Sequence, residues 1–547
     1  MKSNNKKTLL WVYARCKKYI PHILLIAFLS AIVSLGFIWL AMVSKNVLEI
    51  ATGDKQGSFW HHGLILASLV LMQVILSGVD SIFKTAVAGK LTISIREYLF
   101  SVLNRKRYSN VVKLHSGDIL NRFTSDTDVV VNGAVGIIPS VFSMFAKIIG
   151  GVAALILLDP KITIVVLVFG VCVPALGRLI NKRYKYLHKE CQQTEGVSRS
   201  FMQECFENVI VIKTFISEIP FIKKLDGYMK ENYKFKIKRS FISATANLSL
   251  YSFFTIGYYA VLVWGAREIS LGKITYGALI AFLQLISQLR APLQNVSGIM
   301  PRYYSVLASA ERLIEIEDFD DEISPLADEK LSKIKEGFSF IEGKNLEFAY
   351  DKEYVLKNFD FIINKGEVTA FTGESGSGKS TIFKLLLGLY EIENGKITIN
   401  GKVKIDSSLR GLFAYVPQGN MVLSGSIRDN ITMCNENISD EDIIKAAKIA
   451  EIHDCISSLE NGYDTLLSER GTGLSGGQIQ RISIARALLL DAPILLLDEA
   501  TSELDEITES KVLRNIKQLK DKTVILVTHR NTSLDVCDNV IDITENM

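Results

Sequence analysis

A glycine-rich run beyond the middle of the chain has the residue types and the spacing that bind phosphate. Residues 373–380 read Gly-Glu-Ser-Gly-Ser-Gly-Lys-Ser, between an apolar strand-like run at 367–371 and a helix-like run at 381–387. Glycines let backbone N–H groups crowd around phosphate oxygens, and the helix N-terminus adds its dipole. Lys379 would reach the β- and γ-phosphates, and Ser380 would hold Mg²⁺. The predicted nucleotide-binding residues of this run are Gly373, Ser375, Gly376, Ser377, Gly378, Lys379, Ser380 and Thr381.

Two adjacent carboxylates follow a second apolar strand-like run. Residues 494–497 read Ile-Leu-Leu-Leu and lead directly into Asp498 and Glu499. A carboxylate at a strand end beside a phosphate loop can hold Mg²⁺, which is the role predicted for Asp498. Glu499 can polarise a water for in-line attack on the γ-phosphate. Together with the phosphate loop, this pair predicts ATP hydrolysis.

A five-residue motif lies between these two elements. Residues 474–478 read Leu-Ser-Gly-Gly-Gln and are followed by helix-compatible residues to position 490. With this motif the chain resembles the ATP-binding-cassette (ABC) superfamily, of which it is the signature. In that superfamily the signature of one subunit faces the phosphate loop of the other. The resemblance therefore implies that Ser475, Gly477 and Gln478 contact a nucleotide held by a partner chain.

Four further residues or motifs follow the order of that superfamily. Tyr350 matches the aromatic residue that stacks on adenine, and Gln418 matches the glutamine that joins Mg²⁺ and the attacking water to the membrane domain. Residues 502–505, Ser-Glu-Leu-Asp, resemble the D-loop, and His529 resembles the histidine that contacts the γ-phosphate. The resemblance implies three catalytic residues, Glu499, His529 and Gln418, and three Mg²⁺ ligands, Ser380, Gln418 and Asp498. One departure is Glu503, a position where alanine is commoner.

The chain carries one cassette, so the resemblance implies that activity requires a dimer. Both halves of the ATP site are intact, including Glu499, and this predicts a homodimer with two competent sites. Pairing with a different, degraded half-transporter stays open, because an intact chain can also serve such a partner. Only 18 residues follow His529, from which we expect a thin C-terminal dimer contact.

The composition of the chain indicates a membrane portion, and its first half carries the long apolar runs. Hydrophobic residues make up 48% of the 547 residues, and the mean hydropathy is +0.23. Six apolar runs come close to the ~20 residues that a spanning helix needs; they lie at 21–44, 62–84, 134–157, 161–182, 244–267 and 275–298. Lys and Arg are concentrated before the first run and in the long segments 85–133 and 183–243, which places these parts in the cytoplasm. The net charge of +4 is small for this length and gives no argument for a nucleic-acid partner.

The two long basic segments also have helical patterning, so the membrane helices are expected to continue far into the cytoplasm. Residues 117–126 and 207–218 resemble the intracellular loops of the exporter branch of the superfamily, and residues 309–312 resemble the end of its sixth helix. Residues 470–473 lie where exporters have a loop that touches these helices. Since the first span begins near residue 21, we expect no export coupled to leader-peptide removal by this chain.

These observations predict a two-domain architecture. Residues 1–320 are expected to form an all-α six-helix transmembrane domain of the type IV ABC exporter kind, with long cytoplasmic helical extensions. Residues 321–335 are expected to form a linker, and residues 336–547 an α/β P-loop ABC nucleotide-binding domain. The expected location is the cell (inner or plasma) membrane, with multiple spans and the nucleotide-binding domain in the cytoplasm.

Polar residues inside two of the predicted spans are the candidates for contact with the cargo. The second run carries Gln73, Ser77, Asp80 and Lys84, and the sixth carries Gln284, Gln288, Arg290 and Asn295. Charges within a membrane are costly and tend to line a cavity or to pair, and Asp80 and Lys84 have the i,i+4 spacing of a pair. The leading hypothesis is ATP-driven export by alternating access of an amphipathic cargo such as a peptide, a drug or a lipid-like molecule. Import of a metal chelate on the same fold, or an ATP-gated channel or sensor, are the alternatives.

Overall fold

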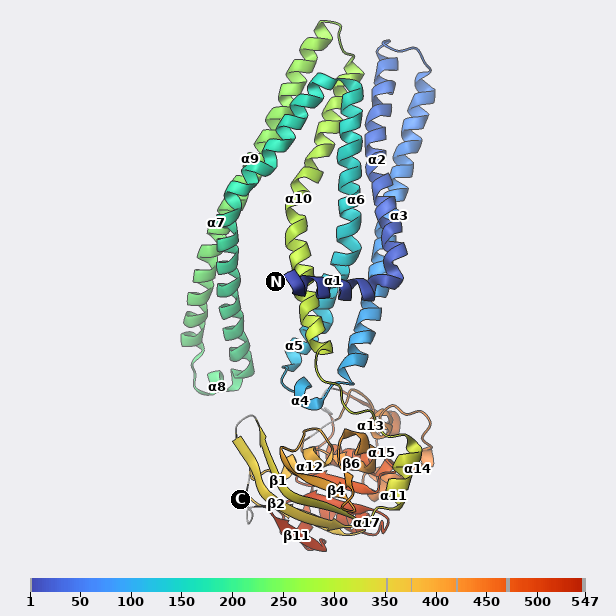
Figure 1. Ribbon diagram of the computed structural model, residues 1–547, viewed down its shortest axis with the longest axis vertical. Helices are drawn as coiled ribbons and strands as arrows, with labels where there is room; N and C mark the ends of the chain where they lie inside the picture. The colour runs from blue at the N-terminus through green and yellow to red at the C-terminus, as the bar shows by residue number, and fades with distance from the viewer. Residues whose placement is uncertain (1, 351–352, 375, 420–421, 469–472, 544–547) are drawn as a thin grey trace. The chain divides into compact units, whose positions relative to one another are not determined.

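The computed structural model describes residues 2–350, 353–374, 376–419, 422–468 and 473–543, with some side chains of its long helices left undescribed. The chain divides into two compact units, each with its own interior. One unit comprises Met1–Ser101 and Ser116–Glu317, and the other comprises Val102–His115 and Asp318–Met547. The first is helical and the second is an α/β unit (Figure 1).

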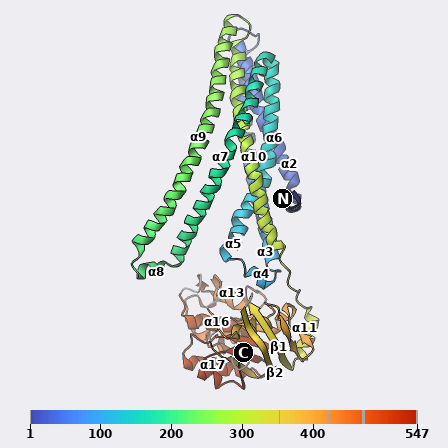
Figure 2. The ribbon, with the colours of Figure 1, turned by 60° about the vertical axis from the view of Figure 1, so that its left-hand side comes forward.

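Long helices make up the first unit. They are α1 (Lys2–Cys16), α2 (Ile20–Ala51), α3 (Phe59–Leu103), α5 (Ser116–Asn121), α6 (Thr127–Leu158), α7 (Pro160–Glu207), α8 (Val209–Thr214), α9 (Glu218–Ser270) and α10 (Tyr276–Glu317). The α2 helix packs on α6 and α10, whereas α7 packs along α9 and is connected to it through α8 (Figure 2); α9 also contacts α10. The predicted continuation of the membrane helices beyond the apolar runs is confirmed, because α3, α7 and α9 span 45, 48 and 53 residues.

Three helical stretches among the described residues are long and apolar enough to cross a membrane. They are Asn5–Ala51, Phe59–Leu103 and Ser116–Leu158, and they contain the first three predicted spans. The other three predicted spans fall on α7, α9 and α10, where part of the side chains lie outside the described residues. Many apolar side chains of the first unit are exposed, as expected for helices solvated by lipid or by a second chain.

Two polar residues of the second predicted span form hydrogen bonds inside the helix bundle. Asp80 is buried, accepts a hydrogen bond from Ser30 on α2 at 2.9 Å and pairs with Lys84 at 2.5 Å. Gln73 is also buried and donates to the Val33 carbonyl at 2.7 Å. Of the two interpretations of Asp80 and Lys84, pairing is the one that the structure supports. That Asp80 also lines a cargo cavity stays a prediction.

Two sheets form the frame of the second unit. The parallel sheet has the order β11-β3-β10-β9-β6, and the antiparallel sheet has the order β2-β1-β4-β5. The strands are β1 (Phe340–Tyr350), β2 (Glu353–Asn364), β3 (Val368–Thr372), β4 (Asn394–Ile399), β5 (Val403–Lys404), β6 (Phe413–Val416), β7 (Gly425–Ser426), β8 (Leu466–Leu467), β9 (Ile494–Asp498), β10 (Thr523–Val527) and β11 (Asn539–Asp542). The helices are α4 (Tyr108–Val111), α11 (Asp328–Glu336), α12 (Lys379–Leu386), α13 (Ile427–Thr432), α14 (Asp440–Ile449), α15 (His453–Ser457), α16 (Gly476–Leu489), α17 (Glu506–Lys517) and α18 (Asn531–Leu534).

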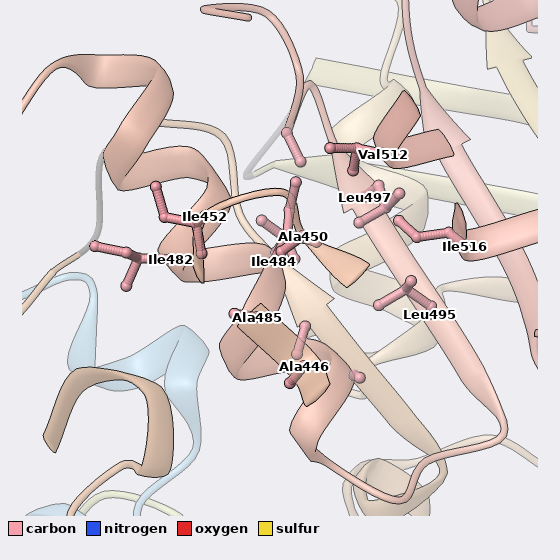
Figure 3. Close-up of a cluster of buried hydrophobic side chains, with 14 of the residues drawn as sticks. Ala446, Ala450, Ile452, Ile482, Ile484, Ala485, Leu495, Leu497, Val512 and Ile516 are labelled. Atoms are coloured by element: carbon pink, nitrogen blue, oxygen red, sulfur yellow. The ribbon is translucent and has the colours of Figure 1, made fainter. Parts of the chain in front are cut away.

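Strand β9 is buried on both faces and separates two hydrophobic cores. Leu495 and Leu497 point into a core shared with α14, α16 and α17 (Figure 3). Ile494 and Leu496 point into the other core, which lies against the antiparallel sheet and α12. Side chains alternate along a strand, so a continuous apolar run is what such a central parallel strand needs. This packing holds the carboxyl end of β9, and with it Asp498, in one position.

A short segment between α3 and α5 belongs to the second unit, although the sequence assigned it to the cytoplasmic extension of the first domain. In this segment Lys106 pairs with Asp321 at 2.7 Å, and Arg107 pairs with Glu391 at 2.8 Å. The ring of Tyr108, at the start of α4, lies edge-on against Tyr390 with centroids 5.9 Å apart. The segment is thus attached to the second unit by charges and by one aromatic contact.

Candidate nucleotide-binding site

The phosphate loop connects β3 to α12, the strand–loop–helix order that the sequence predicts. Gly373, Gly376 and Gly378 have φ values of 140°, 87° and 91°, which side chains rarely adopt. A Cβ on Gly378 would also come within 2.7 Å of Val355. Lys379 folds back over the loop and donates to the Gly373 and Glu374 carbonyls at 2.9 and 2.6 Å. Ser375 lies outside the described residues.

The loop has the unsatisfied polar groups expected of a phosphate site. The buried hydroxyl of Ser377 has no hydrogen-bond partner among the described residues, although such groups are normally paired. Burial lowers the pKa of Lys379, and the nearby carboxylates of Glu499, Asp498 and Asp542 partly oppose this shift. A phosphate would satisfy the hydroxyl and stabilise the ammonium charge. These residues therefore fit a nucleoside polyphosphate.

Asp498 and Ser380 form a candidate cation site beside the loop. Ser380 donates to Asp498 Oδ1 at 2.9 Å, and Tyr415 of β6 donates to Oδ2 at 3.2 Å. Burial raises the pKa of Asp498, Glu499 adds to this shift, and the two hydrogen bonds oppose it. Burial and the Asp498 charge together raise the pKa of Tyr415 well above its usual range. Adjacent hydroxyl and carboxylate oxygens are the ligands that Mg²⁺ prefers, so the pair fits this ion.

Two of the three predicted catalytic residues, Gln418 and His529, converge on the carboxylate of the third, Glu499. Gln418 donates to Glu499 Oε2 at 2.7 Å, and His529 Nε2 lies 3.9 Å from Oε1. Glu499 has a φ of 49°, a left-handed conformation that a non-glycine residue adopts only under constraint. Its backbone N–H donates to the Val527 carbonyl at 3.2 Å, which ties it to the neighbouring strand β10. The left-handed conformation and this hydrogen bond together fix the backbone at Glu499.

Tyr350 lies among aromatic residues at the end of β1. Its ring contacts Phe348 and Tyr390, with centroids 4.9 and 5.3 Å away. Its hydroxyl lies 3.4 Å from both Thr381 Oγ1 and Lys384 Nζ on α12. Since Tyr390 also contacts Tyr108 of α4, an aromatic chain runs from Tyr108 to the residue predicted to stack on adenine.

The signature residues build the N-terminus of α16. Ser475 and Gln478 cap each other: the Gln478 N–H donates to Ser475 Oγ at 3.3 Å, and the Ser475 N–H donates to Gln478 Oε1 at 2.8 Å. Gly477 is close-packed, because a Cβ there would come within 2.9 Å of the Glu503 carbonyl. The Glu503 carboxylate lies against Gly476, where a side chain would collide with it. The capping box, which follows the Ser-x-x-Gln pattern, is a structural role for Ser475 and Gln478 that the sequence analysis did not assign.

Glu509 is a residue of this site that sequence reasoning missed. Its carboxylate, on α17, is completely buried. It accepts four hydrogen bonds, from Thr501 at 2.7 Å, Ser533 at 2.5 Å, Thr532 at 3.0 Å and Arg530 at 3.1 Å. Thr501 lies two residues after Glu499, and Arg530 directly follows His529. One buried carboxylate thus connects the loop that carries Glu499 to the loop that carries His529.

Comparison with known proteins agrees with this architecture. Residues 23–293 match the family model of the ABC transporter transmembrane region, and residues 356–502 match that of the ABC transporter. An ATP-dependent lipid A-core flippase of Haemophilus influenzae is 30% identical over 532 residues, which cover 94% of this chain and 88% of the relative. The chain belongs to the ABC transporter family. It is an exporter-type half-transporter with a fused membrane domain and ATPase domain, and the resemblance stated from its motifs is confirmed.

One further relative and one solved structure show how much of the chain the similarity covers. ABC transporter B family member 1 of Dictyostelium discoideum is 34% identical over 467 residues, which cover 83% of this chain but only 51% of the relative. The structure of a bacterial Atm1-family ABC exporter with ATP bound has the same fold, with a TM-score of 0.75, 22% identity, and coverage of 96% of this chain and 93% of that one. The half-transporter is an ATPase that drives export across a membrane.

Proposed function

We propose that two identical copies of this chain export an amphipathic cargo across the cell membrane by alternating access. In this proposal the ATPase domain lies in the cytoplasm, as the positive charge of the N-terminus and of the long helical segments favours. The observation that carries the proposal is the convergence of Gln418 and His529 on Glu499, beside a loop suited to phosphate. An intact base favours continued turnover over slow gating, which argues against the channel alternative.

Each residue of the site has a proposed role in hydrolysis. Lys379 and the loop N–H groups bind the β- and γ-phosphates, while Ser380, Asp498 and Gln418 supply oxygen ligands. Mg²⁺, when bound there, would neutralise charge on the phosphate oxygens. Glu499 accepts the proton of the attacking water, and Gln418 holds the carboxylate in position. His529 faces the same carboxylate and donates to the γ-phosphate.

The partner chain completes each site through its signature. Ser475, Gly477 and Gln478 begin a 14-residue helix, whose N-terminus attracts anions. Tyr350 stacks on adenine from the other side. Alternating access then follows from closure and release of two such sites. The aromatic chain from Tyr350 to Tyr108 supports a mechanical connection between ATP binding and the segment that follows α3.

Mixed dimers test the shared site and the homodimer together. A Lys379→Ala chain loses its phosphate loop but keeps its signature, and a Ser475→Ala chain has the opposite defect. Each variant alone is expected to lose most ATPase activity, because both of its sites are damaged. Co-expressed chains with different affinity tags, purified through both tags, restore one intact site per dimer, and we expect recovery of a substantial fraction of wild-type activity. Two inactive parents with an equally inactive mixed dimer would contradict sites shared between identical chains.

A further inference from the structure

The structure describes one pocket inside the first unit that joins a membrane-buried cation to aromatic side chains. It lies between α9 and α10, has a volume of about 170 Å³, and is lined by Phe254, Tyr258, Tyr259, Ser287 and Arg290 among others. Arg290 is the sole charged residue of α10 between Tyr276 and Pro301, and the facing part of α9, residues 241–266, carries none. At about 1.5 Å per residue, Arg290 lies roughly 21 Å along α10 from its start and inside the predicted sixth span, residues 275–298.

The charge of Arg290 is not neutralised by an acid in the part of the chain that the structure describes. Its guanidinium carbon lies 4.5 Å from the ring centroid of Tyr251, and no carboxylate pairs with it among those residues. Lys147 on α6 is similar: its ammonium lies 5.0 Å from the ring centroid of Phe37 and pairs with no described acid. In contrast, the intramembrane Asp80 is satisfied by Lys84 and Ser30. The described interior of the bundle therefore has a surplus of positive charge.

The face of an aromatic ring stabilises a desolvated cation less strongly than a carboxylate or phosphate does. A cation–π contact is weaker than the charge-assisted, bidentate hydrogen bonds that a guanidinium donates to a carboxylate or phosphate. An intramembrane arginine with no acidic partner is thus prepared to exchange Tyr251 for an anion. The hydroxyl of Ser287 lies in the same pocket and can donate to the same anion.

We propose that this pocket binds the anionic head of an amphipathic cargo, with Arg290 as its ion-pair partner. The pocket is too small for a whole amphiphile and large enough for one phosphate or carboxylate head. Phe254, Tyr258 and Tyr259 supply apolar surface beside the head, where the start of an alkyl chain or an aromatic group packs. The proposal rests on the proposed export of an amphipathic cargo and specifies its charge.

Equilibrium binding of radiolabelled dodecyl phosphate tests the site directly. The full-length transporter is placed in nanodiscs of phosphatidylcholine, which carries no net charge, and binding to empty discs is subtracted. The wild type is expected to bind dodecyl phosphate saturably. Unlabelled dodecanol, with the same chain and no charge, is expected to compete at least about tenfold more weakly. Inorganic phosphate separates recognition of the free anion from recognition of the amphiphile, and we expect it to compete only weakly.

Three variants test whether Arg290 is the residue that binds dodecyl phosphate. Arg290→Gln is expected to weaken dodecyl phosphate binding about tenfold or more, whereas Arg290→Lys keeps the charge and loses only the bidentate geometry, so its loss is smaller. Arg267→Gln removes an exposed arginine near the end of α9 and is expected to bind like the wild type. Thermal unfolding of each variant excludes a general loss of fold. Equal binding by wild type and Arg290→Gln, an absence of saturable wild-type binding, or equal competition by dodecanol would each overturn the proposal.

A transport measurement separates this proposal from the proposed function. Binding that depends on Arg290, without any ATP-driven movement of amphiphiles, would leave the anion site standing and overturn export of this cargo. ATP-driven accumulation of amphiphiles that does not depend on residue 290 would support export and overturn the anion site.

Discussion

The Glu499→Gln variant is expected to hydrolyse ATP about 10²–10⁴-fold more slowly than the wild type, the range that a positioned general base contributes. The amide keeps the shape of the carboxylate and can still accept the hydrogen bond that Gln418 donates at 2.7 Å. It cannot accept a proton from the attacking water. Nucleotide binding, which depends on the phosphate loop, is expected to persist.

Steady-state phosphate release in nanodiscs measures this effect, and equilibrium binding of a fluorescent ATP analogue measures the nucleotide affinity. Glu506→Gln is the matched control, because it neutralises an exposed carboxylate seven residues further along. The control is expected to hydrolyse ATP like the wild type. If Glu499→Gln also hydrolysed ATP at the wild-type rate, the assignment of the base would be wrong.

Replacing Glu509 by alanine is expected to lower stability by about 3 kcal/mol and to reduce turnover as well. The carboxylate is completely buried and accepts four hydrogen bonds, so its removal leaves Thr501 and Ser533 without their partner. The loops after β9 and β10 then lose one of the groups that connect them, while the hydrogen bonds that Arg530 donates to the Thr501, Ser502 and Leu504 carbonyls remain. Because these loops carry Glu499 and His529, the catalytic constellation loosens together with the fold.

Thermal unfolding of full-length Glu509→Ala measures this loss of stability. Glu506→Ala is the matched control, because Glu506 is an exposed glutamate on the same helix. The pH dependence provides a second readout. Burial alone would raise the pKa of Glu509, but the hydrogen bonds from Ser533, Thr501, Arg530 and Thr532 outweigh it and lower the pKa. The stabilisation is therefore complete above the unfolded pKa of about 4.3 and is lost as the pH falls through the folded value. The difference in stability between wild type and Glu509→Gln is expected to shrink below about pH 4; a difference that grows on acidification would contradict this assignment.

Motif spacing predicted the phosphate loop and its neighbours because their chemistry depends on local backbone. A strand, a glycine loop with positive φ and a helix are contiguous in sequence, so Gly373, Gly378 and Lys379 can be recognised together. Gln418 and His529 are far from Glu499 in the chain, and only the resemblance to the superfamily placed them there. The geometry brings both within 4 Å of the Glu499 carboxylate.

Other features depend on packing that no local pattern records. Glu509 is one acidic residue in the first turn of a helix, a common position on the surface, and only the loops folded over it make it a buried acceptor. Asp80 illustrates the same limit. Its spacing from Lys84 predicted a pair, but the second partner of the carboxylate, Ser30, lies fifty residues earlier in the chain. Likewise, residues 102–115 belong to the second unit, in which Arg107 pairs with Glu391, far away in the sequence.

The most direct test of ATP-driven export is uptake into sealed proteoliposomes with the ATPase domain outside. Radiolabelled dodecyl phosphate is added outside with ATP and Mg²⁺, and the lumen is sampled over time. The account predicts accumulation above equilibrium in wild-type vesicles and none with Glu499→Gln. ATP-driven depletion of vesicles preloaded with the probe, or accumulation that persists in Glu499→Gln, would contradict it.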